Sequence, residues 1–312
     1  MKITFLSSPK KFEGPADGIQ SRSIANWQLV APTSRVLLYG SHPTDRDTIL
    51  SLGAALGGVI ETSQSGIPLF GPIVRDAAKV CEADIQIYLN CDILLPKHFV
   101  SVIEHCFMTF RSCLVIGQRI DLSENVTLSA SPEDWEHSAP QLVAAGQAEL
   151  HGPGGSDYFA FSRGSLDQVP QIIIGRGSYD NAIIAYCLRE GIPVIDASIS
   201  TLVFHQFHDY GHVRGGRGAV FSGADALENR SVVGSIFLPS LQDATHLLLP
   251  NGRMVRNWAR GDWARAAEVY CRFRRKSQSA GDLVRQFGRL LGPVGWSKSK
   301  EWTIDYIESF RV

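Results

Sequence analysis

Short apolar segments alternate with segments of helical spacing over the first 120 residues, and this alternation restricts the fold more than any other feature. A β-α-β-α order predicts a mainly parallel sheet that helices cover on both faces. No G-x-G-x-x-G follows the first expected strand, and no G-x-x-x-x-G-K-[ST] phosphate loop occurs. The expected strands are 3–6, 35–39, 58–61, 85–89 and 113–117, and the expected helices are 21–29, 45–56, 68–81 and 96–110.

The rest of the chain is less regular. Residues 121–151 are polar and rich in Ser, Glu and Pro, which predicts an excursion or a flexible loop. Beyond Gly215 the chain is glycine-rich and then helical. The expected strands here are 156–161, 193–196 and 201–204, and the expected helix is 180–190, ending at Gly191. We expect two parts, an α/β domain over 1–250 and a basic helical extension over 251–312.

Composition restricts the partners and the compartment. A formal net charge of −1 gives no general attraction for polyanions, so we expect no nucleic-acid partner. The six cysteines include no C-x-x-C pair, which predicts reduced thiols rather than a disulfide framework. The N-terminal apolar stretch is too short for a signal peptide, and no run approaches the roughly 18 apolar residues of a membrane span. We therefore expect a cytoplasmic protein.

Two oxygen-bearing side chains, Asn90 and Asp92, directly follow the apolar strand expected at 85–89. In open α/β sheets, ligands bind beyond the carboxyl ends of the strands. A carboxylate placed there can hold a divalent cation, which in turn can hold a diphosphate. The alternative is that both residues form a turn or a helix cap before Pro96.

Three histidines lie within eight residues after the strand expected at 201–204. His205, His208 and His212 accompany Asp209, and imidazole combined with carboxylate suits manganese or a related divalent ion. The spacing is not H-E-x-x-H, and no cysteine accompanies it, so a structural zinc site is not expected. Purely structural histidines are the alternative.

Two acidic residues follow glycine-rich turns. Asp180 stands at the start of the helix expected at 180–190, where an aspartate serves as an N-cap or, if it faces a cleft, as a general base. Asp157 follows Gly154 and Gly155, and is either an acceptor for a substrate hydroxyl or a turn residue.

The C-terminal extension is basic and aromatic. Between residues 253 and 300, twelve Lys and Arg residues face three acidic ones, with Trp and Phe side chains interleaved. This composition suits a peripheral contact with an anionic membrane at the inner membrane face. The other interpretation is a basic, solvated helical face.

An ordered set of segments resembles glycosyltransferases of the GT-A fold, specifically a bacterial family related to the family 2-like enzymes. The set covers about residues 1–250 and leaves the basic extension outside. The matching segments are 20–27, 66–69, 88–93, 155–159, 179–181, 205–210 and 243–245. The resemblance implies a Rossmann-like, mostly parallel sheet flanked by helices, with a helical C-terminal extension. It also implies a nucleotide-diphosphate sugar donor and a glycan or lipid-linked acceptor, as in polysaccharide or glycolipid assembly.

The resemblance also implies roles for individual residues. Asn90 and Asp92 occupy the place of the family's Asp-x-Asp metal motif, with Asp92 the direct ligand of Mn²⁺ or Mg²⁺ and His205 or His208 completing the site. The asparagine lowers the charge of that site. Asp180 occupies the place of the base in inverting members. The residues implied on the donor side, near base, ribose or phosphate, are Ser7, Ser8, Pro9, Gln20, Arg22, Gly66 and Asn90.

Two other functions fit a similar sheet. A sugar nucleotidyltransferase would carry a glycine-rich, basic phosphate loop after its first strand, whereas residues 7–14 read Ser-Ser-Pro-Lys-Lys-Phe-Glu-Gly. A non-catalytic nucleotide- or glycan-binding module would tolerate Asn90 but gives no reason for Asp180 and the histidines together.

Overall fold

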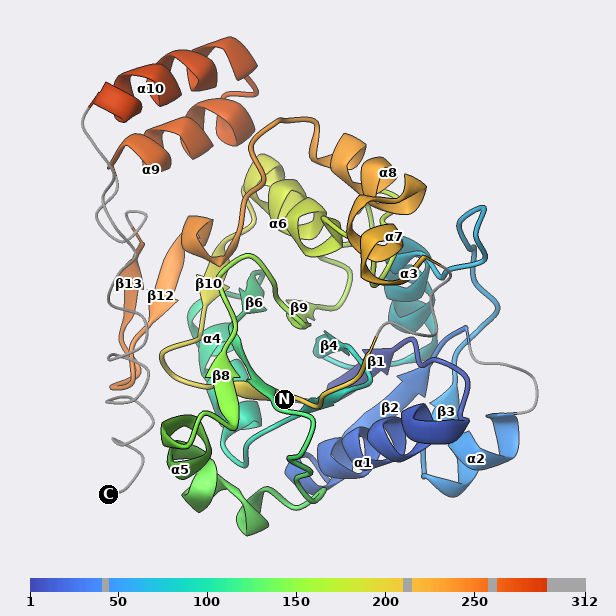
Figure 1. Cartoon of the computed structure of the whole chain (residues 1–312). Helices are drawn as coiled ribbons and strands as arrows, with labels where there is room; N and C mark the ends of the chain where they lie inside the picture. The colour runs from blue at the N-terminus through green and yellow to red at the C-terminus, as the bar shows by residue number, and fades with distance from the viewer. Residues whose placement is uncertain (41–44, 210–214, 258–262, 291–312) are drawn as a thin grey trace.

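A computed structural model describes residues 1–40, 45–209, 215–257 and 263–290 (Figure 1). The main sheet has nine strands in the order β13-β12-β10-β6-β9-β4-β1-β2-β3. Its strands are β1 Ile3–Ser7, β2 Arg35–Leu38, β3 Ala55–Leu56, β4 Ile85–Leu89, β6 Leu114–Ile116, β9 Tyr158–Ser162, β10 Val194–Asp196, β12 His246–Leu248 and β13 Met254–Arg256. A second sheet has the order β5-β11-β7-β8. Its strands are β5 Ile93–Leu94, β7 Arg119–Leu122, β8 Ala148–Leu150 and β11 Val203–His205.

Parallel pairing dominates the main sheet. The pairs β1–β2, β1–β4, β2–β3, β6–β10 and β10–β12 are parallel. Strand β9 runs antiparallel between β4 and β6, and β13 runs antiparallel to β12. The predicted class, a mostly parallel α/β sheet flanked by helices, is therefore confirmed.

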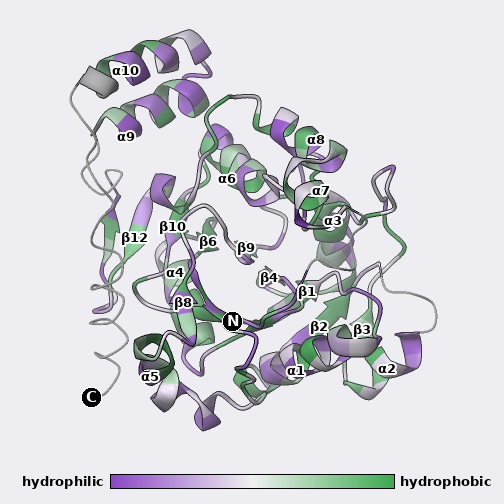
Figure 2. Cartoon of the chain, viewed as in Figure 1, coloured by the Kyte–Doolittle hydropathy of each residue, from purple (hydrophilic) through white to green (hydrophobic). Residues whose placement is uncertain are grey.

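Helices cover both faces of the main sheet. Side chains of α1 (Gly14–Val30) and α4 (Phe99–Thr109) bury against one face, and those of α3 (Phe70–Val80) and α6 (Tyr179–Glu190) against the other. Figure 2 shows β2 as hydrophobic, whereas α1 alternates hydrophilic and hydrophobic residues along its length. The other helices are α2 Arg46–Ser51, α5 Ala139–Ala144, α7 Gly216–Ser222, α8 Ala224–Val233, α9 Trp263–Val269 and α10 Gln278–Leu290.

Residues 121–151 are ordered, so the expectation of a flexible loop was wrong. They contain α5 and β8, together with the 3₁₀ turns Pro132–Asp134 and Glu136–Ser138. Their apolar side chains, with Trp135 buried among them, form a third core with residues of β5 and β11. The segment also contacts α1, where the Asn26 side-chain amide donates to the Ala130 carbonyl at 2.9 Å. A small core built from distant segments has no local sequence signature.

Other elements also differ from expectation. Helix α1 begins at Gly14, not at residue 21, and has a proline in its first turn, where the missing N–H costs nothing. Helix α2 covers only six residues of the range expected to be helical, 45–56. The strand expected at 58–61 is absent from that stretch, because the neighbouring β3 pairs with β2 instead.

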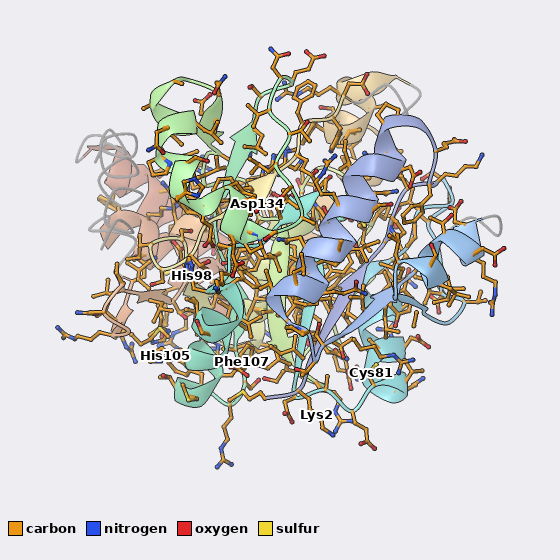
Figure 3. The ribbon with its side chains drawn as sticks, turned by 90° about the horizontal axis from the view of Figure 1, so that it is seen from below. Lys2, Cys81, His98, His105, Phe107 and Asp134 are labelled. Carbon is orange, nitrogen blue, oxygen red and sulfur yellow. The ribbon has the colours of Figure 1, made fainter. Side chains whose placement is uncertain are left out.

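The C-terminal extension packs against the rest of the chain as far as it is described. The expected boundary at residue 250 falls in the turn between β12 and β13, which pair with each other. On α4, the ring of His105, visible with His98 and Phe107 in Figure 3, lies 2.7 Å from the Gly252 carbonyl in this turn. No described helix is long and apolar enough to cross a bilayer.

Several basic residues of the extension have partners within the protein. Arg265 pairs with the buried Asp243 at 2.6 Å, and the buried Arg272 pairs with Glu268 at 2.8 Å and Asp282 at 2.7 Å. These guanidinium groups are therefore not free to contact a membrane. Trp258, Trp296, Lys298 and Lys300 lie outside the described residues.

Candidate functional site

Strand register places the predicted cluster at one edge of the main sheet. Because β1, β2 and β4 are parallel, their carboxyl ends meet at the same edge, and residues 90–92 follow β4 there. The second sheet crosses this edge. Within it, His205 of β11 pairs in register with Ile93 of β5, the residue after Asp92. Two segments more than 100 residues apart in sequence therefore meet at Asp92.

Asp92, His205 and His208 form a cluster in which one ligand atom from each lies within 4.8 Å of the others. His208 Nε2 lies 3.0 Å from Asp92 Oδ2, and His205 Nε2 lies 3.7 Å from the same oxygen. The structure thus brings together the three residues predicted to bind a metal. His212 and Tyr210 lie outside the described residues.

Positive groups around Asp92 keep its carboxylate ionised. Burial alone would raise the pKa of Asp92, but His205, His208 and Lys10 outweigh it and hold that pKa well below its usual range. Burial lowers the pKa of His208, but the hydrogen bond and charge of Asp92 outweigh burial and raise it. The other carboxylate oxygen, Asp92 Oδ1, is buried without a hydrogen-bond partner. Two imidazoles and a buried oxygen with unused lone pairs fit the donor set of a divalent transition metal ion.

Asn90 turns its amide toward the protein. Its Nδ2 donates to Asp157 Oδ1 at 2.5 Å, and its Oδ1 accepts from the Tyr179 hydroxyl at 3.3 Å. Asp157, which is buried, also forms an ion pair with Arg119 through its other oxygen. Both oxygens of Asp157 are therefore engaged by protein donors.

The variant Asn90→Asp has the first acid of the Asp-x-Asp pattern. We predict that it lowers the stability of the folded protein. Asn90 Nδ2 now donates to Asp157 Oδ1 at 2.5 Å. In the variant, a carboxylate oxygen would take the place of this nitrogen, and two carboxylate oxygens so close together repel each other unless one of the two acids takes up a proton. We expect the free energy of unfolding at pH 7 to fall by about 2 kcal/mol or more, as for a buried charge without its partner. Chemical denaturation of both proteins measures this.

The reciprocal exchange provides the control. In the double variant Asn90→Asp, Asp157→Asn the amide and the carboxylate change places, so the hydrogen bond between them can form again. We expect it to be more stable than the Asn90→Asp single variant. Equal stability of Asn90→Asp and the parent would contradict this account of Asn90.

Asp180 lies inside the first turn of α6, which begins at Tyr179, so it is not the N-cap residue. Its Oδ1 accepts the backbone N–H of Asn181 at 2.9 Å and its Oδ2 that of Ser156 at 3.2 Å. Burial raises the pKa of Asp180 to about 6, with Asp157 adding to the effect and the two N–H donors opposing it. A carboxyl group with this pKa is ionised at neutral pH and is more basic than an exposed aspartate.

The predicted donor-side residues fall into two groups. The first group, near the carboxyl end of β1, comprises Ser7, Gln20 and Arg22. Ser7 Oγ donates to the Leu89 carbonyl at 2.6 Å, and Arg22 donates to the Gln206 side chain. Gln20 accepts from the Lys10 backbone N–H at 2.6 Å and donates to the Lys10 carbonyl at 3.1 Å. Ser8 and the buried Pro9 lie in the same loop.

Gly66 lies in a separate, exposed turn. It has a φ of +79°, which favours glycine, and its N–H donates to the Ser63 carbonyl at 2.9 Å. The neighbouring Ser65 bonds Asp225 of α8 at 2.6 Å. None of the described contacts of Gly66 is with the Asp92 cluster.

Four residues near the cluster were missed in the sequence. Lys10 is close enough to Asp92 to affect its pKa, while burial lowers the pKa of Lys10 itself. Arg119, Asp121 and His151 form a charged group beside His205, with His151 Nδ1 at 2.7 Å from Asp121 Oδ2. The alternation of residues 119–122, charged then apolar, was a usable strand signal, because it puts both charges on one face.

A cavity of about 160 Å³ is lined in part by Gln206 and Phe207, the two residues between His205 and His208 in the sequence. Its lining includes Arg22, Glu124, Thr127, Gln206 and Phe207. Gln206 links it to the cluster, because the Gln206 backbone N–H donates to the Asp92 carbonyl at 3.0 Å.

No protein-family model and no curated protein matches the sequence. Solved structures do resemble the chain. The glucosyl-3-phosphoglycerate synthase of Mycobacterium tuberculosis is 14% identical with a TM-score of 0.46, covering 75% of this chain and 81% of its own. A complex of that enzyme with Mn²⁺, UDP-glucose and phosphoglyceric acid is 16% identical with a TM-score of 0.45, covering 75% and 80%. The 4-diphosphocytidyl-2C-methyl-D-erythritol synthase of Anaerococcus prevotii is 9% identical with a TM-score of 0.35, covering 75% and 98%.

Proposed function

We propose that this chain is a glycosyltransferase that moves a hexosyl or related sugar from a nucleotide-diphosphate sugar to an acceptor hydroxyl, with inversion. The convergence of Asp92, His205 and His208 at the carboxyl ends of the parallel strands carries the proposal. Ligands of open α/β sheets bind at this edge. The sequence resemblance described above supplies the reaction class.

Asp92, His205 and His208 would hold a divalent cation, Mn²⁺ or Mg²⁺. Such an ion supplies charge neutralisation for a nucleotide diphosphate as it leaves. Lys10 adds a cationic side chain next to Asp92, on a loop whose backbone is held by both amide atoms of Gln20. Arg22 adds a guanidinium group in the adjoining cavity. Lys10 and Arg22 are therefore the two cationic side chains proposed to interact with the diphosphate.

Asp180 is proposed as the base that takes the proton of the acceptor hydroxyl. Its raised pKa, about 6, supports this role because a base works best with a pKa near the working pH. Asp157, expected to contact a substrate hydroxyl, is proposed instead to position Asn90 and Arg119, because it forms an ion pair with Arg119, whereas the donors to Asp180 are backbone N–H groups.

A thermal-shift screen tests the proposal. Uridine, guanosine, cytidine, adenosine and thymidine diphosphates and their sugars would be added with and without Mn²⁺, and the matching monophosphates serve as controls. At 100 times its Kd a ligand adds about 2.7 kcal/mol of stability, which raises the Tm by on the order of 5 °C or more. We expect at least one diphosphate to raise the Tm, and to raise it further when Mn²⁺ is present. If no diphosphate shifts the Tm under either condition, the proposal fails.

A further inference from the structure

A series of charged residues connects His205 to the segment that carries Asp92. His205 contacts Asp121, Asp121 pairs with Arg119, and Arg119 pairs with Asp157. Asp157 in turn accepts from Asn90, two residues before Asp92. Neither the resemblance nor the proposed reaction gives Asp121 a role, although it lies at the centre of this group.

Asp121 fixes which nitrogen of His205 carries a proton. His205 Nδ1 lies 3.1 Å from Asp121 Oδ1. An ionised carboxylate only accepts hydrogen bonds, so Nδ1 must be the donor. In the neutral ring, Nε2 then keeps its lone pair, and this is the nitrogen that faces Asp92. The orientation follows from strand register, because His205 of β11 and Asp121 of β7 are direct partners in a parallel pair.

The second imidazole has the same arrangement with a different acceptor. His208 Nδ1 lies 2.9 Å from the backbone carbonyl of Asp209, and its Nε2 faces Asp92. A carbonyl oxygen likewise only accepts, so Nδ1 is the donor here too. Metal binding requires neutral imidazoles, and in that form both rings would present an Nε2 lone pair on the side where Asp92 lies. In proteins that bind metals through histidine, the outer nitrogen commonly donates to a carboxylate or a carbonyl in this way.

Asp121 is itself held in place from two directions. Arg119 Nε donates to its Oδ1 at 2.7 Å, and His151 Nδ1 lies 2.7 Å from its Oδ2. With Arg119 also paired to Asp157, the carboxylate cannot rotate away from His205 without breaking several contacts. This rigidity is what the orientation of an imidazole ligand requires.

We propose that Asp121 is a positioning residue for the cation site, holding His205 with Nε2 directed at the ion. The proposal rests on the cation cluster of the proposed function. Asp121 does not ligate the ion, so its removal should weaken binding without abolishing it. Loss of such an outer carboxylate typically costs 10- to 100-fold in metal affinity.

The test is Mn²⁺ binding to the purified 312-residue chain, measured by calorimetry and by the electron paramagnetic resonance signal of free Mn²⁺. We expect Asp121→Asn to raise the Kd by about 10-fold or more, because an amide oxygen is a weaker acceptor and its NH₂ can present a donor to His205. Glu149→Gln is the matched control: Glu149 is the exposed partner of Asp121 across the β7–β8 pair, and its removal should leave the Kd unchanged.

A second variant separates positioning from the loss of one negative charge. In a His205→Ala background, Asp121→Asn should change the Kd by less than about 3-fold, because Asp121 acts through His205. An equal effect in both backgrounds, or an unchanged Kd for Asp121→Asn, would overturn the role of Asp121 and leave the cation site intact. A parent protein that binds no Mn²⁺ would overturn the cation site together with this role.

Discussion

Replacing Asp180 with asparagine is expected to lower the rate of sugar transfer by about 100-fold or more, the usual effect of removing a general base. The variant keeps the side-chain shape and one acceptor oxygen, so donor binding should be nearly unchanged. The change should therefore appear in kcat rather than in the affinity for the donor. Transfer assays with the donor found by thermal shift, together with calorimetry of that donor, separate the two quantities.

The pH dependence gives an independent check on Asp180. With a pKa raised to about 6, the carboxylate form grows as pH rises through 6, so transfer by the parent should rise over that range, and the rise should be absent in Asp180→Asn. The free energy of unfolding should decrease as the pH rises from about 3.8 to about 6, because the folded protein binds the Asp180 proton more tightly than the unfolded chain does. Ionising Asp180 costs up to about 3 kcal/mol of unfolding free energy over this range. Near-normal turnover by the variant would leave Asp180 with a structural role only.

Replacing Asp92 with asparagine is expected to remove Mn²⁺ binding from the range that calorimetry detects. The carboxylate is the one anionic member of the three-residue cluster, and hard divalent ions depend on carboxylate oxygens. The stabilisation of the protein by a nucleotide diphosphate with Mn²⁺ should disappear with it. Thermal shift and calorimetry on the same preparations measure both effects.

Glu124→Gln is a suitable control for Asp92→Asn. Glu124 is exposed and lines the neighbouring cavity, so its substitution removes a nearby negative charge without touching the cluster. It should leave Mn²⁺ binding within about 2-fold of the parent, given that exposed charges act weakly through water. Tight Mn²⁺ binding by Asp92→Asn would show that the ion binds elsewhere.

The parts of the candidate site that lie close together in the sequence could be predicted from it. The strand before Asn90 and Asp92 is a continuous apolar run, and its carboxyl end is where parallel sheets bind ligands, so the position of Asp92 followed directly. His205 and His208 were found because they lie close together in the sequence. The structure adds that both contact Asp92.

The remainder of the site depends on contacts between distant strands. The ion pair between Asp157 and Arg119 depends on the relative placement of β7 and β9. The contact between Asp121 and His205 depends on the register of β7 and β11. The alternation in such short strands can identify a strand, but it does not specify which strand it pairs with or in which register. The amide of Asn90 was read as a weakened metal ligand because its partner, Asp157, could not be seen.

The separation of the cluster residues along the chain has a consequence for protein synthesis. Asp92 and His208 are 116 positions apart, and β11, which carries His205, pairs with β5 and β7, which are made much earlier. At about 5–20 residues per second, the ribosome adds the histidines on the order of ten seconds after Asp92. During that interval the nascent chain lacks two of the three residues of the cluster. An ion that needs all three residues could therefore bind only after His208 has been made.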